Sequence, residues 1–142
     1  MGFHLAHPPP CSKDARMEVA SWLRQNTNHG DRIGSWNAGL LGYFSHRHVT
    51  VLDGLVGNAE FYRQVVRDRR IVGYLRTEHV NWLADYTRGL EITLSPFQAS
   101  LFSPEALREL NREFGLVASF AGPDPAGACP APGLAAWRRA TP

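Results

Sequence analysis

The sequence predicts a single α/β domain with a three-layer, Rossmann-like arrangement, in which a small, mainly parallel sheet has helices on both faces. Two short apolar runs, residues 33–36 and 49–52, each end at a polar residue that a glycine follows closely, as buried strands do at one edge of a sheet. Stretches with helical spacing of apolar residues lie before and after these runs. The length of 142 residues suits one hydrophobic core and is short for two.

Composition favours a folded protein and points to no strongly charged partner. Hydrophobic residues make up 44% of the chain, which argues against general disorder. The formal net charge of +2 is too small to attract nucleic acid or an anionic membrane strongly, so we expect no nucleic-acid partner. No stretch approaches the roughly 20 apolar residues of a membrane span, and the first ten residues lack the apolar core of a signal peptide. The polypeptide as given is therefore expected to be soluble.

The two ends of the chain are predicted to differ from its middle. Residues 1–12 form a flexible, proline-rich leader, because the run Pro8-Pro9-Pro10 disfavours a helix and little there is apolar. The single α/β domain then spans residues 13–142. Cys11 and Cys129 lie in proline-rich flanks far apart in the sequence, and both one disulfide and two unrelated thiols agree with this spacing.

The first half of the domain is predicted to run from a helix to a strand, and then through a short helix or turn to a second strand. Ala15, Val19, Trp22 and Leu23 have the spacing of one helix face, and the polar residues 26–30 end that helix. The elements that follow are a strand over residues 33–36, an apolar segment over residues 40–44 and a strand over residues 49–52.

The second half is predicted to hold a parallel crossover, a further helix and two more strands. Residues 61–66 and 71–78 have helical spacing, with a break near residues 68–70, and residues 79–85 form a third strand that ends on Asp85. Ser103 and Pro104 are a strong helix start. The remaining elements are a helix that Gly115 closes, a strand over residues 117–120 and a strand over residues 134–138. The sequence leaves open whether these C-terminal strands are antiparallel, and residues 90–102 are ambiguous.

Polar side chains stand where the three predicted parallel strands end. These residues are Asn37, Asp53 and Asp85. The carboxyl ends of parallel strands meet at one edge of a sheet, where α/β proteins bind ligands. Amide and carboxylate groups suit a hydroxyl-rich ligand or a hard cation. The alternative is that Asn37 and Asp53 only cap the turns that follow them, as these residue types commonly do.

Other motifs indicate no cofactor and no catalytic residue. His46 and His48 would share one face of an extended segment, but a protein metal site needs three or four ligands, so we predict no metal there. The dinucleotide, P-loop and nucleophile-elbow motifs are absent from the sequence, and a divalent cation has no support beyond the strand ends. Five arginines are predicted to line a solvated helix face, with a phosphate contact left open: Arg63, Arg67, Arg69, Arg70 and Arg76.

Several blocks of the sequence, taken in order, resemble a known family. They are Val-Ala-Ser-Trp-Leu-Arg-Gln-Asn-Thr at 19–27, Gly-Asp-Arg-Ile-Gly at 30–34, Trp-Asn-Ala-Gly at 36–39, Gly-Tyr-Phe-Ser at 42–45, Leu-Asp-Gly-Leu-Val at 52–56, and Asn58. They look like the C-terminal soluble domain of bacterial multi-span membrane glycosyltransferases of the GT-C class, which are related to dolichyl-phosphate-mannose mannosyltransferases. The likeness covers residues 17–86 in detail and the rest only loosely.

The resemblance implies a soluble accessory domain on the extracytoplasmic side of a bacterial membrane. Its partners would be the transmembrane part of the glycosyltransferase and a lipid-linked sugar, carried on a polyprenyl phosphate, or the acceptor of that sugar. In that family the catalytic acidic residues lie in loops between membrane spans, so no catalytic residue is carried over, and we expect the chain alone to transfer no sugar. The candidate ligand-binding residues are Asn37, Gly39, Tyr43, Asp53, Gly54, Asn58 and Asp85.

Two other functions agree with the same residues. One is a stand-alone α/β protein or enzyme that binds a small molecule, a sugar or a cation, through Asn37, Asp53 and Asp85. The other is a structural interaction domain. A reading frame for membrane spans that continues in phase upstream of Met1 would favour the accessory domain over both.

Overall fold

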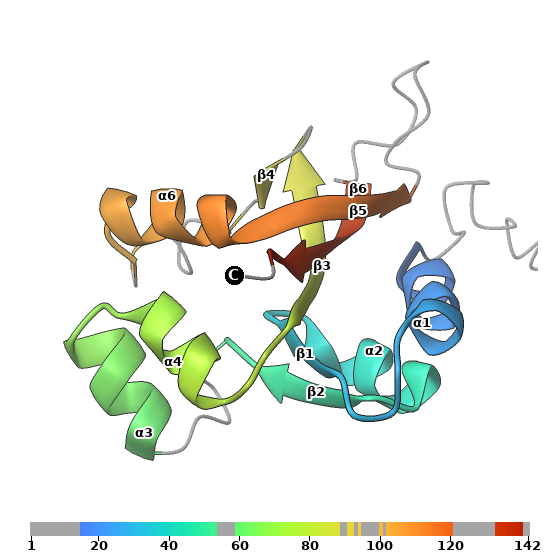
Figure 1. Ribbon diagram of the computed structural model, residues 1–142, viewed down its shortest axis with the longest axis horizontal. Coiled ribbons are helices and arrows are strands. Elements are labelled where there is room, and N and C mark those ends of the chain that lie inside the picture. Colours follow the sequence, from blue (N-terminus) through green and yellow to red (C-terminus); the bar gives the residue numbers. More distant parts are fainter. Residues whose placement is uncertain are drawn as a thin grey trace, which may run out of the picture.

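The computed structural model describes residues 15–53, 59–88, 91–92, 94, 100, 102–120 and 133–140 (Figure 1). The predicted leader, both cysteines and two candidate ligand residues, Gly54 and Asn58, lie outside the described residues. The helices are α1 (Ala15–Asn26), α2 (Ala38–Ser45), α3 (Ala59–Phe61), which continues into the π-helical segment η2 (Tyr62–Arg67), α4 (Ile71–Thr77) and α6 (Pro104–Glu113). The strands are β1 (Arg32–Ser35), β2 (His48–Val51), β3 (Trp82–Arg88), β4 (Glu91–Ile92), β5 (Phe114–Phe120) and β6 (Gly133–Arg139).

The described strands form one mixed sheet in the order β2-β1-β3-β6-β5, and β4 pairs with β3 beside this path. β1 is parallel to both β2 and β3, whereas β6 is antiparallel to β3 and β5 is antiparallel to β6. The predicted α/β fold is confirmed, and the C-terminal strands, whose direction the sequence left open, pair in the antiparallel sense. The parallel crossover is confirmed as well, since α3, η2 and α4 lie between β2 and β3 in the chain.

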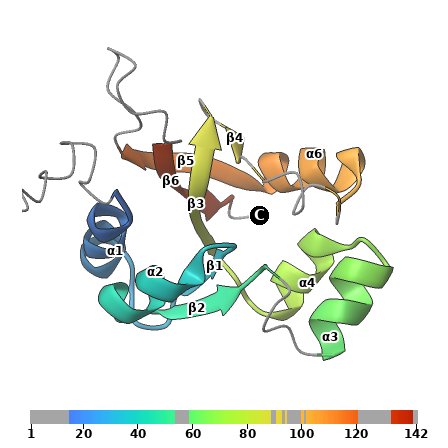
Figure 2. The ribbon, with the colours of Figure 1, turned by 180° about the vertical axis from the view of Figure 1, so that it is seen from behind.

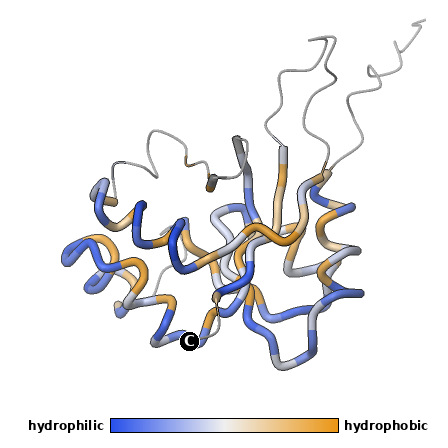
Figure 3. The backbone as a smooth tube through the Cα atoms, turned by 45° about the horizontal axis from the view of Figure 1, so that its top comes forward, coloured by the Kyte–Doolittle hydropathy of each residue, from blue (hydrophilic) through white to orange (hydrophobic). Residues whose placement is uncertain are grey.

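Helices cover both faces of the sheet. Figures 1 and 2 show α1 and α2 on one side and α3, α4 and α6 on the other. Successive strand residues point to opposite faces, so Trp82 of β3 enters the core that contains α1 and α2, and Leu83 enters the core that contains the other helices. Hydrophobic and hydrophilic stretches alternate along the turns of the helices (Figure 3), as they do in helices that cover a sheet.

Gly34 lies where β1 packs most closely against its neighbours. A Cβ at this position would lie 2.9 Å from Leu52 Cδ1, 2.9 Å from Leu83 Cδ2 and 3.2 Å from Val80 Cγ1. The side chains around β1 therefore occupy the space that a larger residue would need. Protein cores are packed too densely to absorb such an addition without displacement.

The third strand begins three residues later than predicted, and the prediction that Asp85 ends this strand is wrong. The backbone before the strand closes α4 instead: Val80 N–H donates to Leu75 O at 2.9 Å, and His79 adopts a left-handed φ of 54°. Helices commonly end with a left-handed residue of this kind. Since these groups are not available to the sheet, β3 spans Trp82–Arg88 and Asp85 lies in its middle.

The strand after α6 also begins earlier than predicted. Gly115, which was expected to close the helix, lies in β5. Phe114 is the C-cap of α6, with an extended φ of −115° and ψ of 113°, and its ring is buried in the core beside that helix. The spacing of apolar residues does not show whether Phe114 belongs to the helix or to the strand that directly follows it.

Candidate functional site

Asn37 and Asp85, two of the predicted strand-end residues, are in contact at the carboxyl end of β1. Asn37 Nδ2 donates to Asp85 Oδ1 at 2.8 Å. The register explains this contact, because Gly34 pairs with Leu83 and Asp85 is then level with the turn that follows β1. The Asn37 side chain makes no capping hydrogen bond to α2, so the interpretation that it only caps the following turn is wrong.

The Asp85 carboxylate accepts hydrogen bonds from five described donors. The donors to Oδ2 are Ser35 Oγ (3.0 Å), Trp36 N (2.6 Å) and Asn37 N (3.2 Å). The donors to Oδ1 are Asn37 Nδ2 (2.8 Å) and Tyr86 N (2.8 Å). A carboxylate offers about four lone-pair positions, so these donors saturate it. Asp85 therefore fixes the β1–α2 turn and has no position left for a ligand.

Burial sets the electrostatics of this network. Asp85 is 2% exposed. Burial raises the pKa of its carboxyl group, and the hydrogen bonds from Tyr86 N–H, Asn37, Trp36 N–H and Ser35 counteract the rise only in part. The hydrogen bonds from these donors thus offset part of the free-energy cost of burying the ionised carboxylate. Loss of any one donor would leave more of that cost uncompensated.

Asp53 stands at the same edge of the sheet. Ser35 of β1 pairs with Val51 of β2, and Leu52 N–H donates to Ser35 O at 2.9 Å, which places Asp53 beside the turn after β1. Asp53 is half-buried, whereas Asp85 is buried. Of the two strand-end carboxylates, Asp53 is therefore the more exposed one.

Gly39 and Tyr43 share the open side of α2. They are four residues apart and so lie on the same helix face. Apart from its chain neighbours and the backbone of α2, no described atom lies within 4 Å of the place where a Cβ of Gly39 would be. Tyr43 is 76% exposed, and its ring meets the ring of Phe44 edge-on, with 4.9 Å between the centroids. This face thus combines exposed backbone and an exposed aromatic ring next to the strand ends.

The histidine pair does not form the arrangement that an extended segment would give. His46 is the C-cap of α2 with a left-handed φ of 53°, and only His48 belongs to β2. Within the described ranges, no three side chains of His, Cys, Asp or Glu gather as a metal ion would require. The helices of the described part are all too short or too polar to cross a membrane.

Ser35 is a member of the network that reasoning from the sequence missed. It is buried at the end of β1, donates to Asp85, and accepts a hydrogen bond from Asn37 N at 3.0 Å. The signal in the sequence was a hydroxyl residue inside the apolar run 33–36. Near it, Trp36 Nε1 and Thr50 Oγ1 are buried without a hydrogen-bond partner among the described residues.

Comparison with known proteins places the chain in a family. A model of a family described as a domain of unknown function (DUF8728) matches residues 8–137. The chain belongs to this family. The match begins before α1 and ends within β6, so the DUF8728 unit comprises nearly all of the described fold.

Among solved structures, this DUF8728 chain is similar to the C-terminal globular domain of an oligosaccharyltransferase from Archaeoglobus fulgidus. The identity is 12%, the TM-score is 0.48, and the alignment covers 87% of this chain and 95% of the other. Comparison with curated proteins gives no match. At this identity and TM-score, the likeness carries no information about ligands or activity.

Proposed function

We propose that this DUF8728 chain is an accessory domain of a membrane glycosyltransferase on the extracytoplasmic side of a bacterial membrane. It positions a polyprenyl-phosphate sugar, or the acceptor of that sugar, for a transmembrane catalytic part. The transmembrane part supplies the acidic residues that catalyse transfer, and the chain alone transfers no sugar.

The observation that carries this proposal is where the blocks of sequence resemblance lie in the fold. Residues 30–34, 36–39 and 42–45 fall in or beside β1, in the β1–α2 turn and in α2, and residues 52–53 directly follow β2. Residues 36–39 and 52–53 lie at the carboxyl edge of the parallel strands, where α/β folds place their ligands, and residues 33–34 of β1 lead to this edge. Two of the described blocks, residues 36–39 and 52–53, thus meet at one candidate site.

Within this site we assign different roles to the strand-end residues. Asp85 is a positioning residue, because its hydrogen bonds hold the backbone at Trp36 and Asn37 and leave no acceptor for a ligand. Asp53 is the acceptor for sugar hydroxyl groups, since it is the more exposed carboxylate at this edge. The ring of Tyr43 on the open side of α2 supplies an apolar surface with a polar tip, which suits the mixed surface of a sugar.

The same geometry weakens the alternative of a stand-alone cation-binding protein. A hard cation takes six or more oxygen ligands, most of them from carboxylates, carbonyls and water. The oxygens of Asp85 already accept from backbone and side-chain donors, and the nearby Asn37 amide turns its NH2 group toward Asp85. Asp53 alone would then have to hold the ion.

A nuclear magnetic resonance titration tests the proposal. The isotope-labelled chain is titrated with farnesyl-phosphate mannose and farnesyl-phosphate glucose in lipid nanodiscs, with farnesyl phosphate as the ligand that lacks a sugar. We expect the backbone signals of Gly39, Tyr43 and Asp53 to shift with a sugar-bearing lipid, and Asp53→Asn to abolish the shift in a variant that urea unfolding shows to be folded. Glu105→Gln is the control, because that exposed carboxylate lies on α6, which covers the other face of the sheet.

Two results would count against the proposal. One is an unchanged spectrum around α2 and Asp53 with every sugar-bearing lipid. The other is turnover of a farnesyl-phosphate sugar by the chain alone, because the account assigns transfer to a transmembrane part.

A further inference from the structure

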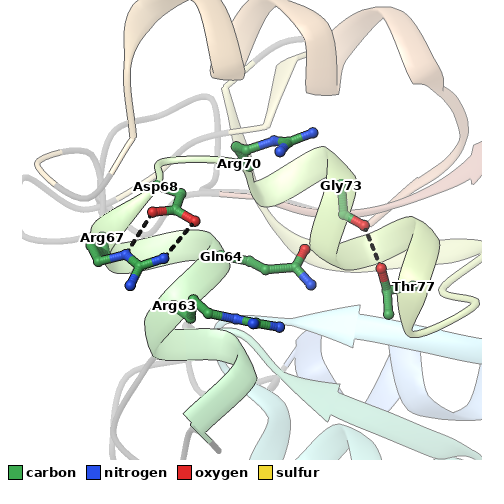
Figure 4. A pocket seen from close by; sticks show the side chains of 7 residues that line it. All are labelled: Arg63, Gln64, Arg67, Asp68, Arg70, Gly73 and Thr77. Atoms are coloured by element: carbon green, nitrogen blue, oxygen red, sulfur yellow. Dashed lines mark hydrogen bonds and ion pairs between the residues drawn. The ribbon is translucent and has the colours of Figure 1, made fainter.

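The helical layer formed by α3, η2 and α4 carries an excess of positive charge away from the strand-end site. Between residues 59 and 77 the sequence has five arginines and two carboxylates. A hollow of about 330 Å³ opens in this layer (Figure 4), near the lower end of the roughly 300 to 1,000 Å³ of small-molecule pockets. Its lining residues are Arg63, Gln64, Arg67, Asp68, Arg70, Gly73 and Thr77.

The backbone builds this hollow through the π-helical segment. Asp68 N–H donates to Arg63 O at 3.1 Å, the longer reach of a π-helix, and Arg70 N–H donates to Gln64 O at 2.7 Å. Arg69 has a left-handed φ of 54°, which turns the chain into α4. Segments of this helix type occur mostly as single-turn irregularities, and frequently at functional sites.

Gly73 keeps the hollow open on the side of α4. A Cβ at this position would meet Gln64 Oε1 and Arg70 Cβ at 3.8 Å, so a longer side chain would extend among the lining residues. Thr77 Oγ1 donates to Gly73 O at 3.1 Å, which leaves the hydroxyl oxygen on this wall. The wall of α4 is thus backbone and a hydroxyl group, while η2 supplies Arg63 and Arg67, and the N-cap of α4 supplies Arg70.

The arginines of the hollow differ in how far their charge is neutralised. Arg67 makes a forked ion pair with Asp68, at 2.7 and 3.1 Å, and Arg63 pairs with Glu60. The Arg70 guanidinium has no hydrogen bond or ion pair with any residue that the structure describes. An arginine stays charged at any physiological pH, so the hollow keeps uncompensated positive charge beside Arg70.

A second hollow of about 240 Å³ adjoins the first through Arg70 and Gly73 but differs in charge. Glu105 and Glu109 line it together with Arg69, Arg70 and Arg76, and Arg76 lies 3.6 Å from Glu109. Carboxylates there would repel an anion. In the first hollow Asp68 pairs with Arg67 and Glu60 pairs with Arg63, so the charge of Arg70 remains and favours an anion there.

We propose that the first hollow, between η2 and α4, binds a phosphate group, with Arg70, whose guanidinium pairs with no described residue, as the main donor. Planar guanidinium groups match the oxygens of a phosphate and make charge-assisted hydrogen bonds to it. The phosphate is either a free phosphate or diphosphate in solution, or the head group of a lipid. This site goes beyond the proposed function, since it involves none of the strand-end residues and is tested without any sugar.

Isothermal titration calorimetry with inorganic phosphate and pyrophosphate tests the site, and flotation of the chain with vesicles tests the lipid source. The vesicles are phosphatidylcholine with and without phosphatidic acid. We expect saturable binding that weakens as salt is added, and a loss of about tenfold in affinity in Arg70→Gln, the size expected for one charge-assisted contact. Gly73→Leu should also weaken binding by filling the hollow, and leucine favours the helix.

Arg24→Gln is the matched control, because Arg24 is an exposed arginine of α1 on the other side of the sheet. Urea unfolding of each variant shows that it is folded. Binding of pyrophosphate that Arg70→Gln weakens and Arg24→Gln does not supports the site in solution, and the same pattern with phosphatidic acid vesicles alone identifies a lipid head group. Absence of binding to both, or equal loss in both variants, overturns the proposal and leaves the proposed function untouched.

Discussion

Asp85→Asn tests whether a buried carboxylate holds the β1–α2 turn. The substitution keeps the size of the side chain but replaces one acceptor oxygen with an NH2 group. In the better orientation, the amide oxygen takes the place of Oδ2 and keeps the bonds from Ser35, Trp36 N and Asn37 N. The NH2 group then faces the Asn37 amide and Tyr86 N–H, so two donors lose their acceptor.

The expected loss follows from these two donors. A buried donor without an acceptor costs about 1 to 3 kcal/mol. The Asn37 side chain is half-buried and can turn toward water, and the neutral amide avoids the desolvation that raises the pKa of Asp85. We therefore expect the free energy of unfolding to fall by about 2 kcal/mol. Urea unfolding followed by tryptophan fluorescence should show a midpoint lower by about 1 M.

Asp68→Asn is the matched control for this measurement. It makes the same chemical change at an exposed carboxylate that pairs with Arg67, and it should leave the urea midpoint close to that of wild type. If Asp85→Asn were as stable as Asp68→Asn, the carboxylate would not be what fixes the turn, and the assignment of Asp85 as a positioning residue would be refuted.

Three other measurements test the packing and the electrostatics. Gly34→Ala places a methyl group 2.9 Å from Leu52 Cδ1 and should lower stability by about 1 to 3 kcal/mol. Gly39→Ala meets no atom within 4 Å and should leave stability unchanged or raise it by up to about 1 kcal/mol, so equal urea midpoints for the two variants would contradict the packing account. His46→Gly should raise stability by about 0.5 to 1 kcal/mol, because glycine adopts a φ of 53° without steric penalty, and a lower midpoint would argue against strain at this cap. Because burial raises the pKa of Asp85 above its ordinary value of 3.8, the native state keeps that proton to higher pH than the unfolded chain. The stability advantage of wild type over Asp85→Asn should therefore shrink as pH rises above that value. An advantage that grows with pH over this range would contradict a raised pKa of Asp85.

Most elements could be predicted because burial repeats along the sequence. The stripe of Val19 and Leu23 predicted α1, and the apolar runs before Asn37 and Asp53 predicted β1 and β2. Ser103 was predicted to begin α6, and its side chain accepts from Ala106 N in the structure. These signals act over a few residues, so the sequence contains them in full.

Contacts between distant segments could not be predicted in this way. The start of β3 depends on how Leu75 and Val80 close α4, and apolar spacing does not encode this. The donors to Asp85 in and after β1 lie about 50 residues away in the sequence. A local pattern therefore could not indicate that hydrogen bonds would saturate its carboxylate. Arg47 likewise donates to Arg24 O at 2.6 Å and joins the loop before β2 to α1. The residues next to Arg47 in the sequence do not indicate this contact.

The same limit applies to the arginine-rich layer. The sequence predicted the charge of this helix face, and it left a phosphate contact open. It held no signal for the π-helical segment η2 or for the hollow beside Gly73, because both arise from how η2 and α4 pack.

The most direct test of the central claim is sugar transfer by membranes from the organism that encodes the chain. Membranes from cells lacking the coding segment for residues 13–142 are compared with membranes from unaltered cells, using a radiolabelled polyprenyl-phosphate sugar pool and the native acceptors. We expect transfer to be lost, the wild-type segment to restore it, and the segment with Asp53→Asn to restore the amount of protein without restoring transfer. Unchanged transfer in membranes that lack the segment would contradict the account.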